Sequence, residues 1–133
     1  GPFDVVLGNP PYYEIRDNSN LYAHFSDVVS GRPNIFSMFF KAGLEALKPG
    51  GQLGFVVPPS MNHGAFFAAL RRYITEQAEI CYMRVLETSR LFLDAQQSVQ
   101  IIVLRKGGRG TQFQFRRSWN EGGLEAAFQG PDG

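Results

Sequence analysis

An asparagine, two prolines and a tyrosine stand directly after an apolar run, in the stretch LGNPPYYE at residues 7–14. The amide oxygen of Asn9 is a hydrogen-bond acceptor, and the carbonyl of Pro10 is a second one, held rigidly between proline-containing peptides. Together the two oxygens can accept both hydrogens of an exocyclic amine, which localises the nitrogen lone pair and makes the amine nucleophilic. Tyr12 can stack on the face of an aromatic ring. The stretch therefore predicts activation of an aromatic amine for attack on a strong electrophile, such as a sulfonium methyl, without a strong base.

The segments that must position this stretch alternate between strand and helix patterns. Short apolar runs indicate buried strands, and apolar residues at helical spacing indicate amphipathic helices. Asn34 is a predicted N-cap, and Pro49 with its two following glycines is a predicted helix stop. The predicted order is strand 3–8, helix 34–48, strand 52–60, helix 63–77, strand 79–87 and strand 98–106, followed by an edge strand around Phe113 and Phe115.

This order predicts an α/β fold, because alternating strands and helices form parallel sheets through crossover connections. The last two main strands lack a helix between them and are expected to be antiparallel. Ligands bind such sheets beyond the carboxyl ends of the strands. Asn9 and both double prolines, Pro10-Pro11 and Pro58-Pro59, fall at these ends. The predicted site therefore lies at the carboxyl edge of the sheet.

Composition restricts the class of protein. The chain has 133 residues, 44% hydrophobic and 19% charged, which suits one globular domain. A formal net charge of +1 does not by itself indicate a nucleic-acid partner. A single cysteine fits a reducing compartment, and no apolar run has membrane length, so we expect a cytoplasmic protein without a membrane partner. The two histidines lack partners at metal-ligand spacing, so no metal site is expected.

Several apolar residues are expected to pack rather than to act. Tyr13 is interpreted as a packing residue, and Cys81 as a buried, inert thiol in a strand. The phenylalanines of the two helices are expected in the core, namely Phe36, Phe39, Phe40, Phe66 and Phe67.

Three blocks in order carry a family resemblance. NPPY after an apolar strand resembles motif IV of the S-adenosylmethionine-dependent amino-methyltransferases. The stretch ALKPGGQLGFVVPPS looks like the next strand of that family and its entry. The stretch LFLDAQQSVQIIVLRKGGRG looks like its later aromatic-containing motif. Together, over about residues 3–117, they resemble the adenine-N6 DNA methyltransferases of the TaqI type, found in restriction-modification systems.

The resemblance implies a fold and a set of roles. The fold would be the second half of a Rossmann-like class I methyltransferase sheet, its strands 4 to 7 with two helices, mostly parallel with an antiparallel final strand. Asn9 and Pro10 would hydrogen-bond N6 of a flipped adenine in DNA, and Tyr12 would stack on it. Phe92 would contact the base from another side, and Pro11 would lie near the cofactor, S-adenosylmethionine. Base flipping is expected because N6 is not reachable in line with the methyl group inside a duplex.

The chain also departs from this family. The glycine-rich turn and the ribose-binding acidic residue that hold the cofactor are absent before residue 9, so most of the cofactor site is missing. We therefore expect residues 3–119 to form a partial catalytic domain, inactive alone, with 120–133 as a tail or an added linker. The strand at 3–8 should expose an edge where its neighbour belongs. The missing N-terminal half, or self-association, is expected to cover it.

Other functions remain open from the sequence. NPPY also occurs in methyltransferases that act on glutamine amides of release factors, and close variants act on guanine N2 in RNA. The block from Phe92 to Lys106 favours adenine in DNA. A catalytically silent folding or binding module is the alternative of a different class, and the missing cofactor half supports it.

Overall fold

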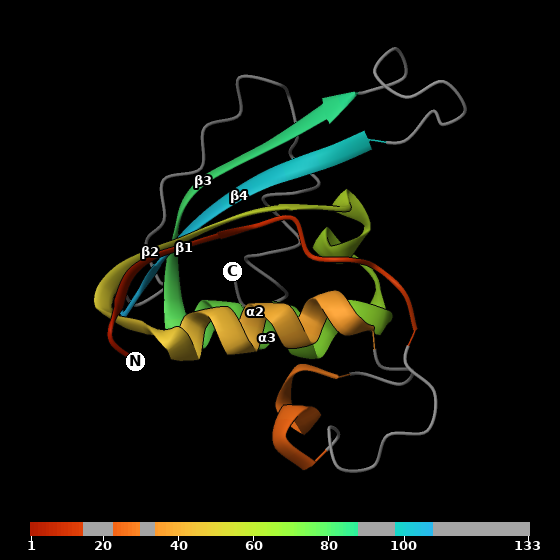
Figure 1. Cartoon of the computed structure of the whole chain (residues 1–133). Coiled ribbons are helices and arrows are strands. Elements are labelled where there is room, and N and C mark those ends of the chain that lie inside the picture. The colour runs from red at the N-terminus through yellow and green to blue at the C-terminus, as the bar shows by residue number, and fades with distance from the viewer. Residues whose placement is uncertain (15–22, 30–33, 88–97, 108–133) are drawn as a thin grey trace.

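The computed structural model describes residues 1–14, 23–29, 34–87 and 98–107 of the chain. These residues form an α/β arrangement of four strands with the helices α2 and α3 and three short 3-10 helices (Figure 1). The elements are β1 (Phe3–Gly8), η1 (Ser26–Val28), α2 (Ile35–Ala46), β2 (Leu47–Val57), η2 (Pro59–Asn62), η3 (Ala65–Phe67), α3 (Ala68–Gln77), β3 (Ala78–Glu87) and β4 (Ser98–Lys106). The predicted order of strands and helices is confirmed from residue 3 to residue 106.

The four strands form one mixed sheet in the order β1-β2-β4-β3. Strand β1 runs parallel to β2, with Gly8 opposite Phe55. Strand β4 is antiparallel to both of its neighbours, β2 and β3. The prediction of an antiparallel final strand is therefore confirmed, and that strand lies inside the sheet between β2 and β3.

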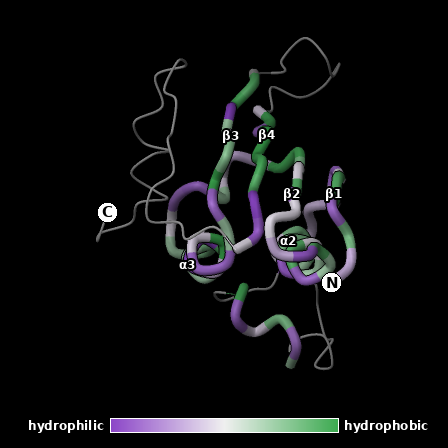
Figure 2. The backbone as a smooth tube through the Cα atoms, turned by 90° about the vertical axis from the view of Figure 1, so that its left-hand side faces the viewer, coloured by the Kyte–Doolittle hydropathy of each residue, from purple (hydrophilic) through white to green (hydrophobic). Residues whose placement is uncertain are grey.

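Helices α2 and α3 lie side by side on the same face of the sheet (Figures 1 and 2). The core lies between these helices and the strand residues that face them. Its fully buried members come from every layer, and include Phe36, Phe40, Leu44, Leu53, Val57, Leu70, Ile74, Ile102 and Leu104. Removal of this apolar surface from water is the main driving force that holds α2 and α3 to the sheet.

Helix α2 connects the two parallel strands and begins at the predicted N-cap. The side-chain oxygen of Asn34 accepts a hydrogen bond from the backbone N–H of Phe36 at 3.1 Å. Gly43 lets the helix approach the sheet closely, because a Cβ there would lie 2.7 Å from Cδ1 of Leu53. The close approach sets the position of α2 beneath the end of β1.

Strand β2 begins earlier than the sequence indicates. Pro49 and the two glycines after it do not separate helix from strand, because β2 already starts at Leu47. The pairing with β1 shifts between Phe3, opposite Leu47, and Val5, opposite Gln52. The extra β2 residues form a bulge in which Gly50 has a φ of 84°, a conformation that glycine adopts without strain.

Some expected packing positions differ from the structure. Phe36 and Phe40 are fully buried as expected, but Phe39 and Phe66 are 41% and 38% exposed. Tyr13 is also exposed, and it is its backbone carbonyl that makes the contact, by accepting a hydrogen bond from the N–H of Ile35 at 3.0 Å. These side chains lie at the carboxyl edge and on the outer side of α2, where helical spacing alone does not distinguish core from surface.

Cys81 is exposed rather than buried. A register shift between Ile80 and Tyr82 displaces it from the buried row of β3, which is why strand alternation mispredicts its side. No helix in the described part of the chain is long and apolar enough to cross a membrane. The predicted edge strand around Phe113 and the domain boundary near residue 119 lie outside the described residues.

Candidate active site

The predicted site residues follow β1 without a break. Strand β1 ends at Gly8, and Asn9, Pro10 and Pro11 come next, so the backbone leaves the ladder where the prolines offer no N–H. Strand β2, which is parallel, ends at Val57, and Pro58 and Pro59 follow it. The two double prolines therefore terminate neighbouring parallel strands at the same edge of the sheet, as predicted.

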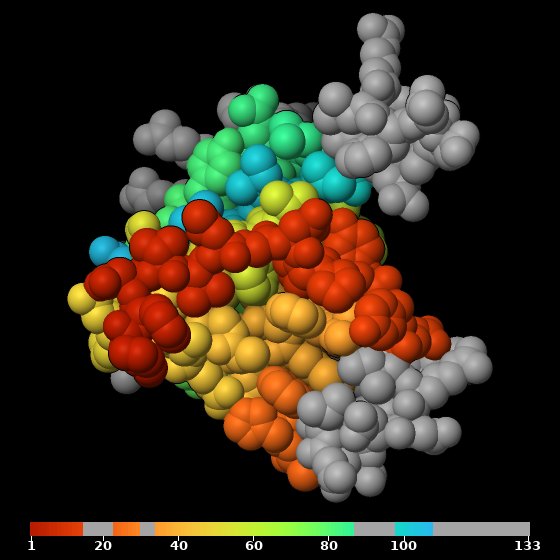
Figure 3. All heavy atoms as spheres, in the orientation of Figure 1, coloured from red at the N-terminus to blue at the C-terminus, as the bar shows by residue number. Residues whose placement is uncertain are grey.

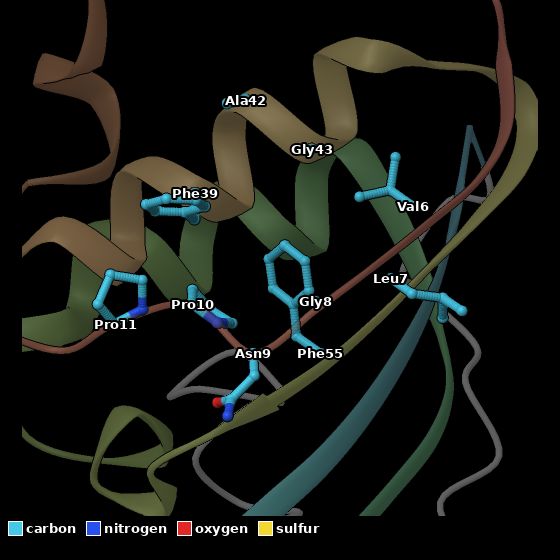
Figure 4. A pocket seen from close by; sticks show the side chains of 10 residues that line it. All are labelled: Val6, Leu7, Gly8, Asn9, Pro10, Pro11, Phe39, Ala42, Gly43 and Phe55. Atoms are coloured by element: carbon cyan, nitrogen blue, oxygen red, sulfur yellow. The ribbon is translucent and has the colours of Figure 1, made fainter.

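A groove of about 350 Å³ lies between the end of β1 and helix α2 (Figure 4). Its walls are mostly apolar, and Asn9 contributes an uncharged polar side chain. The lining residues are Val6, Leu7, Gly8, Asn9, Pro10, Pro11, Phe39, Ala42, Gly43 and Phe55. Three of the predicted site residues thus share one concave surface, the kind of surface on which small ligands bind.

Asn9 and Pro10 differ in their surroundings. Pro10 is buried and anchors the turn, whereas Asn9 is exposed, with its amide pointing away from α2 (Figure 4). Within the described part of the chain, the Asn9 amide makes no hydrogen bond. Its oxygen is therefore available as an acceptor for a ligand, at the end of a backbone that the adjacent prolines hold in place.

Tyr12 stands at the rim of the same turn. Its side chain is 43% exposed, and its ring meets Phe36 edge-on, with the ring centroids 6.2 Å apart and the planes at 83°. This contact holds the ring at the rim, where its exposed part is accessible to a ligand. The backbone beyond it is tied down by an isolated bridge between Glu14 and Asn34. Phe92, the fifth predicted site residue, lies outside the described residues.

Sequence reasoning missed the α2 side of the groove. Phe39, Ala42 and Gly43 line it, at positions i, i+3 and i+4 of one helix. This spacing defines a helix face and could have identified them. Of these three residues the sequence predicts only Phe39 in the core, yet its side chain is 41% exposed and lines the groove.

The groove is open because β1 lies at an edge of the described sheet. Its apolar residues Phe3, Val5 and Leu7 are 58%, 56% and 78% exposed. In the space-filling view β1 lies across the surface that faces the viewer (Figure 3). The expected exposed strand edge is therefore present in the described part of the chain.

The shifted pKa values belong to supporting groups rather than to the groove. Burial, reinforced by the carboxylates of Glu45 and Asp27, raises the pKa of Tyr73 to about 12. Burial lowers the pKa of Arg71, whose guanidinium donates to the carbonyl oxygens of Met61 and Gly64. Both side chains come from α3, and the hydrogen bonds of Arg71 brace the turn at Met61 and Gly64. The acceptor oxygens of Asn9 and Pro10 carry no charge.

Comparison with known proteins places this geometry in a family. The family profile described as Eco57I restriction-modification methylase matches residues 1–92, which include β1, the turn at Asn9 and β2. The chain belongs to the Eco57I restriction-modification methylase family. The resemblance inferred from the NPPY turn and the α/β fold inferred from the strand order are both confirmed.

Individual relatives agree with this family. The type II methyltransferase M.TthHB8I of Thermus thermophilus is 28% identical over 121 residues, covering 81% of this chain and 27% of the relative. The type II methyltransferase M.BsuBI of Bacillus subtilis is 25% identical over 109 residues, covering 82% and 22%. The chain thus spans about a quarter of the length of these relatives.

A solved structure extends the agreement to the fold. A Listeria monocytogenes protein described as a class I S-adenosylmethionine-dependent methyltransferase superposes with a TM-score of 0.71 at 26% identity. The match covers 86% of this chain and 36% of that one. The sheet order β1-β2-β4-β3 is therefore part of a Rossmann-like methyltransferase sheet.

Proposed function

We propose that this chain is the substrate-binding part of an adenine-N6 DNA methyltransferase of a restriction-modification system. The observation that carries the proposal is the turn at the end of β1, where the exposed amide of Asn9 and the backbone of buried Pro10 follow each other beside an apolar groove. Membership of the Eco57I restriction-modification methylase family supports DNA as the substrate.

Each residue of the turn has a separate role in activating the amine. The amide oxygen of Asn9 and the carbonyl oxygen of Pro10 accept the two hydrogens of N6 of an adenine turned out of the duplex. The hydrogen bonds draw the lone pair out of conjugation with the ring and direct it toward the methyl donor. Tyr12, held edge-on against Phe36, stacks on the adenine face. Phe92 is assigned to another side of the base.

The groove fits part of S-adenosylmethionine. Its apolar walls, with Pro10 and Pro11 at one end, suit the uncharged portions of that molecule, which supplies an electrophilic methyl group when bound. The lining residues include no carboxylate that could bind ribose hydroxyls. We infer that this chain holds the cofactor beside Pro11 and that the rest of the site comes from elsewhere in the catalytic domain.

The exposed side chains of β1 also support a cofactor site shared between this chain and the rest of the catalytic domain. Phe3, Val5 and Leu7 are apolar side chains of β1, and each is more than half exposed. The N-terminal half of the catalytic domain is the partner that would cover them, and without it the chain is inactive. Titration of S-adenosylmethionine into the 133-residue chain should show no binding, and one-to-one binding would refute the shared cofactor site.

The decisive experiment changes Asn9 in a polypeptide that also carries the cofactor half of the domain. Asn9→Ala should lower the rate of methyl transfer to DNA by about 100-fold to 1,000-fold, because it removes an acceptor that acts on the reacting amine. Cofactor affinity, measured by calorimetry, should stay unchanged. Asn9→Asp keeps an acceptor oxygen at the same position and should recover part of the rate.

Product analysis separates the possible substrates. N6-methyladenine in the digested DNA supports the proposal, whereas methylated guanine or glutamine would assign the turn to another amine. A near-normal rate for Asn9→Ala would show that the role given to Asn9 is wrong. A silent binding module, which the open β1 edge and incomplete groove also fit, would give no methyl transfer even with the cofactor half present.

A further inference from the structure

A row of aromatic rings leads from Tyr12 to the turn that follows β2. Tyr12 contacts Phe36 at a centroid distance of 6.2 Å, Phe36 contacts Phe67 at 4.9 Å, and Phe67 contacts Phe66 at 4.9 Å. The row joins the turn after β1 to η3, two segments more than fifty residues apart in the sequence. Both segments lie at the carboxyl edge of the sheet (Figure 1).

The row is buried in the middle and exposed at its two ends. Phe36 is fully buried, whereas Tyr12 is 43% exposed and Phe66 is 38% exposed. Helical spacing predicts Phe66 as a core residue, so its exposure needs another explanation. An aromatic ring at the surface next to a nucleobase-binding turn is placed to stack on a second ring.

The turn that carries Phe66 is fixed on two sides. Asn62 and Gln100 are fully buried and donate to each other, with N-to-O distances of 2.5 Å and 2.9 Å. The guanidinium of Arg71 donates to the carbonyl oxygen of Met61 at 3.0 Å and to that of Gly64 at 2.6 Å. Phe66 therefore projects from a rigid base, as a contact residue should, since a preordered ring loses little entropy on binding.

Gly64 gives the turn its direction. Its φ of 86° lies in the region that glycine adopts without strain, and it comes two residues before Phe66. Gly64 therefore joins the fixed part of the turn to the segment that carries the exposed ring through a conformation that other residues adopt only with strain. The geometry of the turn thus depends on Gly64 and Arg71. Packing of the Phe66 ring in the core does not explain its presence, because the ring is 38% exposed.

We propose that Phe66 is a second stacking surface, which binds an unpaired nucleobase of DNA next to the one held by Tyr12. The inference rests on the proposed function, because it takes DNA as the substrate. Every base has a π-face, so stacking of this kind contributes affinity without reading sequence. A strand distorted by the extrusion of one nucleotide offers unstacked neighbours to such a ring.

The test measures binding of the 133-residue chain to a fluorescently labelled single-stranded oligonucleotide that contains adenine. Phe66→Ala should weaken binding by about 5-fold to 100-fold, the range found when base-stacking aromatic side chains are truncated. Phe66→Trp keeps an aromatic face and should restore affinity. Phe3→Ala removes an equally apolar, 58% exposed ring at the opposite end of β1, and should leave binding unchanged.

Each outcome bears on one claim. Weakening by Phe66→Ala and rescue by Phe66→Trp support the inference. Unchanged affinity in Phe66→Ala, or no binding by the unchanged chain, overturns it. Loss of binding in Tyr12→Ala but not in Phe66→Ala would keep the proposed function and exclude Phe66. The proposed function itself is decided separately, by the methyl-transfer rate of the Asn9 variants.

Discussion

Strands β1 and β2 are parallel neighbours with similar apolar sequences, yet one is exposed and the other is buried. In β1, Phe3, Val5 and Leu7 are more than half exposed, and in β2, Leu53 and Val57 are fully buried. The difference comes from the face of the sheet. Val5 and Leu7 lie opposite Gln52 and Gly54, on the face away from the helices, whereas Leu53 and Val57 face α2 and α3. An apolar strand pattern therefore does not show which face of the sheet is covered.

The carboxyl ends of the two strands also differ in how exposed they are. The end of β2 is closed, because Val57 is opposite Gln100 and the following turn is fixed by the Asn62–Gln100 pair. The end of β1 presents the exposed amide of Asn9 and an open groove. The closed end of β2 is therefore the rigid side of the site, and the exposed polar groups lie at the open end of β1.

The largest effect should come from the closed core. Phe40→Ala removes a fully buried ring that packs against Phe55 at a centroid distance of 5.0 Å, and should lower the free energy of unfolding by about 3–5 kcal/mol. Phe3→Ala, the same change on the open strand, should cost within about 0.5 kcal/mol. Urea denaturation of both variants tests the difference. Equal losses would mean that β1 is as well packed as the core.

A smaller loss is expected at the closed end of β2. Gln100→Ala leaves the buried amide of Asn62 without its partner, which should cost about 1–3 kcal/mol. Thermal unfolding at neutral pH measures it, and Gln52→Ala at an exposed position of β2 is the matched control. The double variant Asn62→Ala with Gln100→Ala tests the coupling. If its loss in free energy of unfolding equals the sum of the losses in the two single variants, the two amides do not act as a pair.

The smallest effect appears only at high pH. Because the pKa of Tyr73 is raised to about 12 in the folded chain, from about 10 when unfolded, its contribution is complete below pH 10. The protonated Tyr73 stabilises the folded state below pH 10, and this stabilisation is lost as the pH rises through 12. The free energy of unfolding should fall by about 2 kcal/mol over this range. Tyr73→Phe should remove this loss from pH-dependent unfolding curves. Tyr82→Phe, at a 44% exposed position, should retain it.

The sequence predicted the order of elements and the turn at Asn9, and both depend on local signals. Prolines end strands wherever they occur, and Asn34 caps α2 through its own side chain. The bulge at Gly50 and the exposure of Cys81 depend on register between strands, which local patterns do not encode. Phe66 was assigned to the core because helical spacing does not show where a helix begins, and α3 begins after it, at Ala68.

The central place of β4 has a consequence for the way the chain acquires its structure. Strands β2 and β3 make no ladder with each other, since β4 lies between them and pairs with both. During synthesis the ribosome releases β2 and β3 first, and their facing edges stay unpaired until residues 98–106 emerge. Folding of this sheet must wait for its last strand, so a nascent chain stalled before that point would expose two strand edges and bind a chaperone or aggregate.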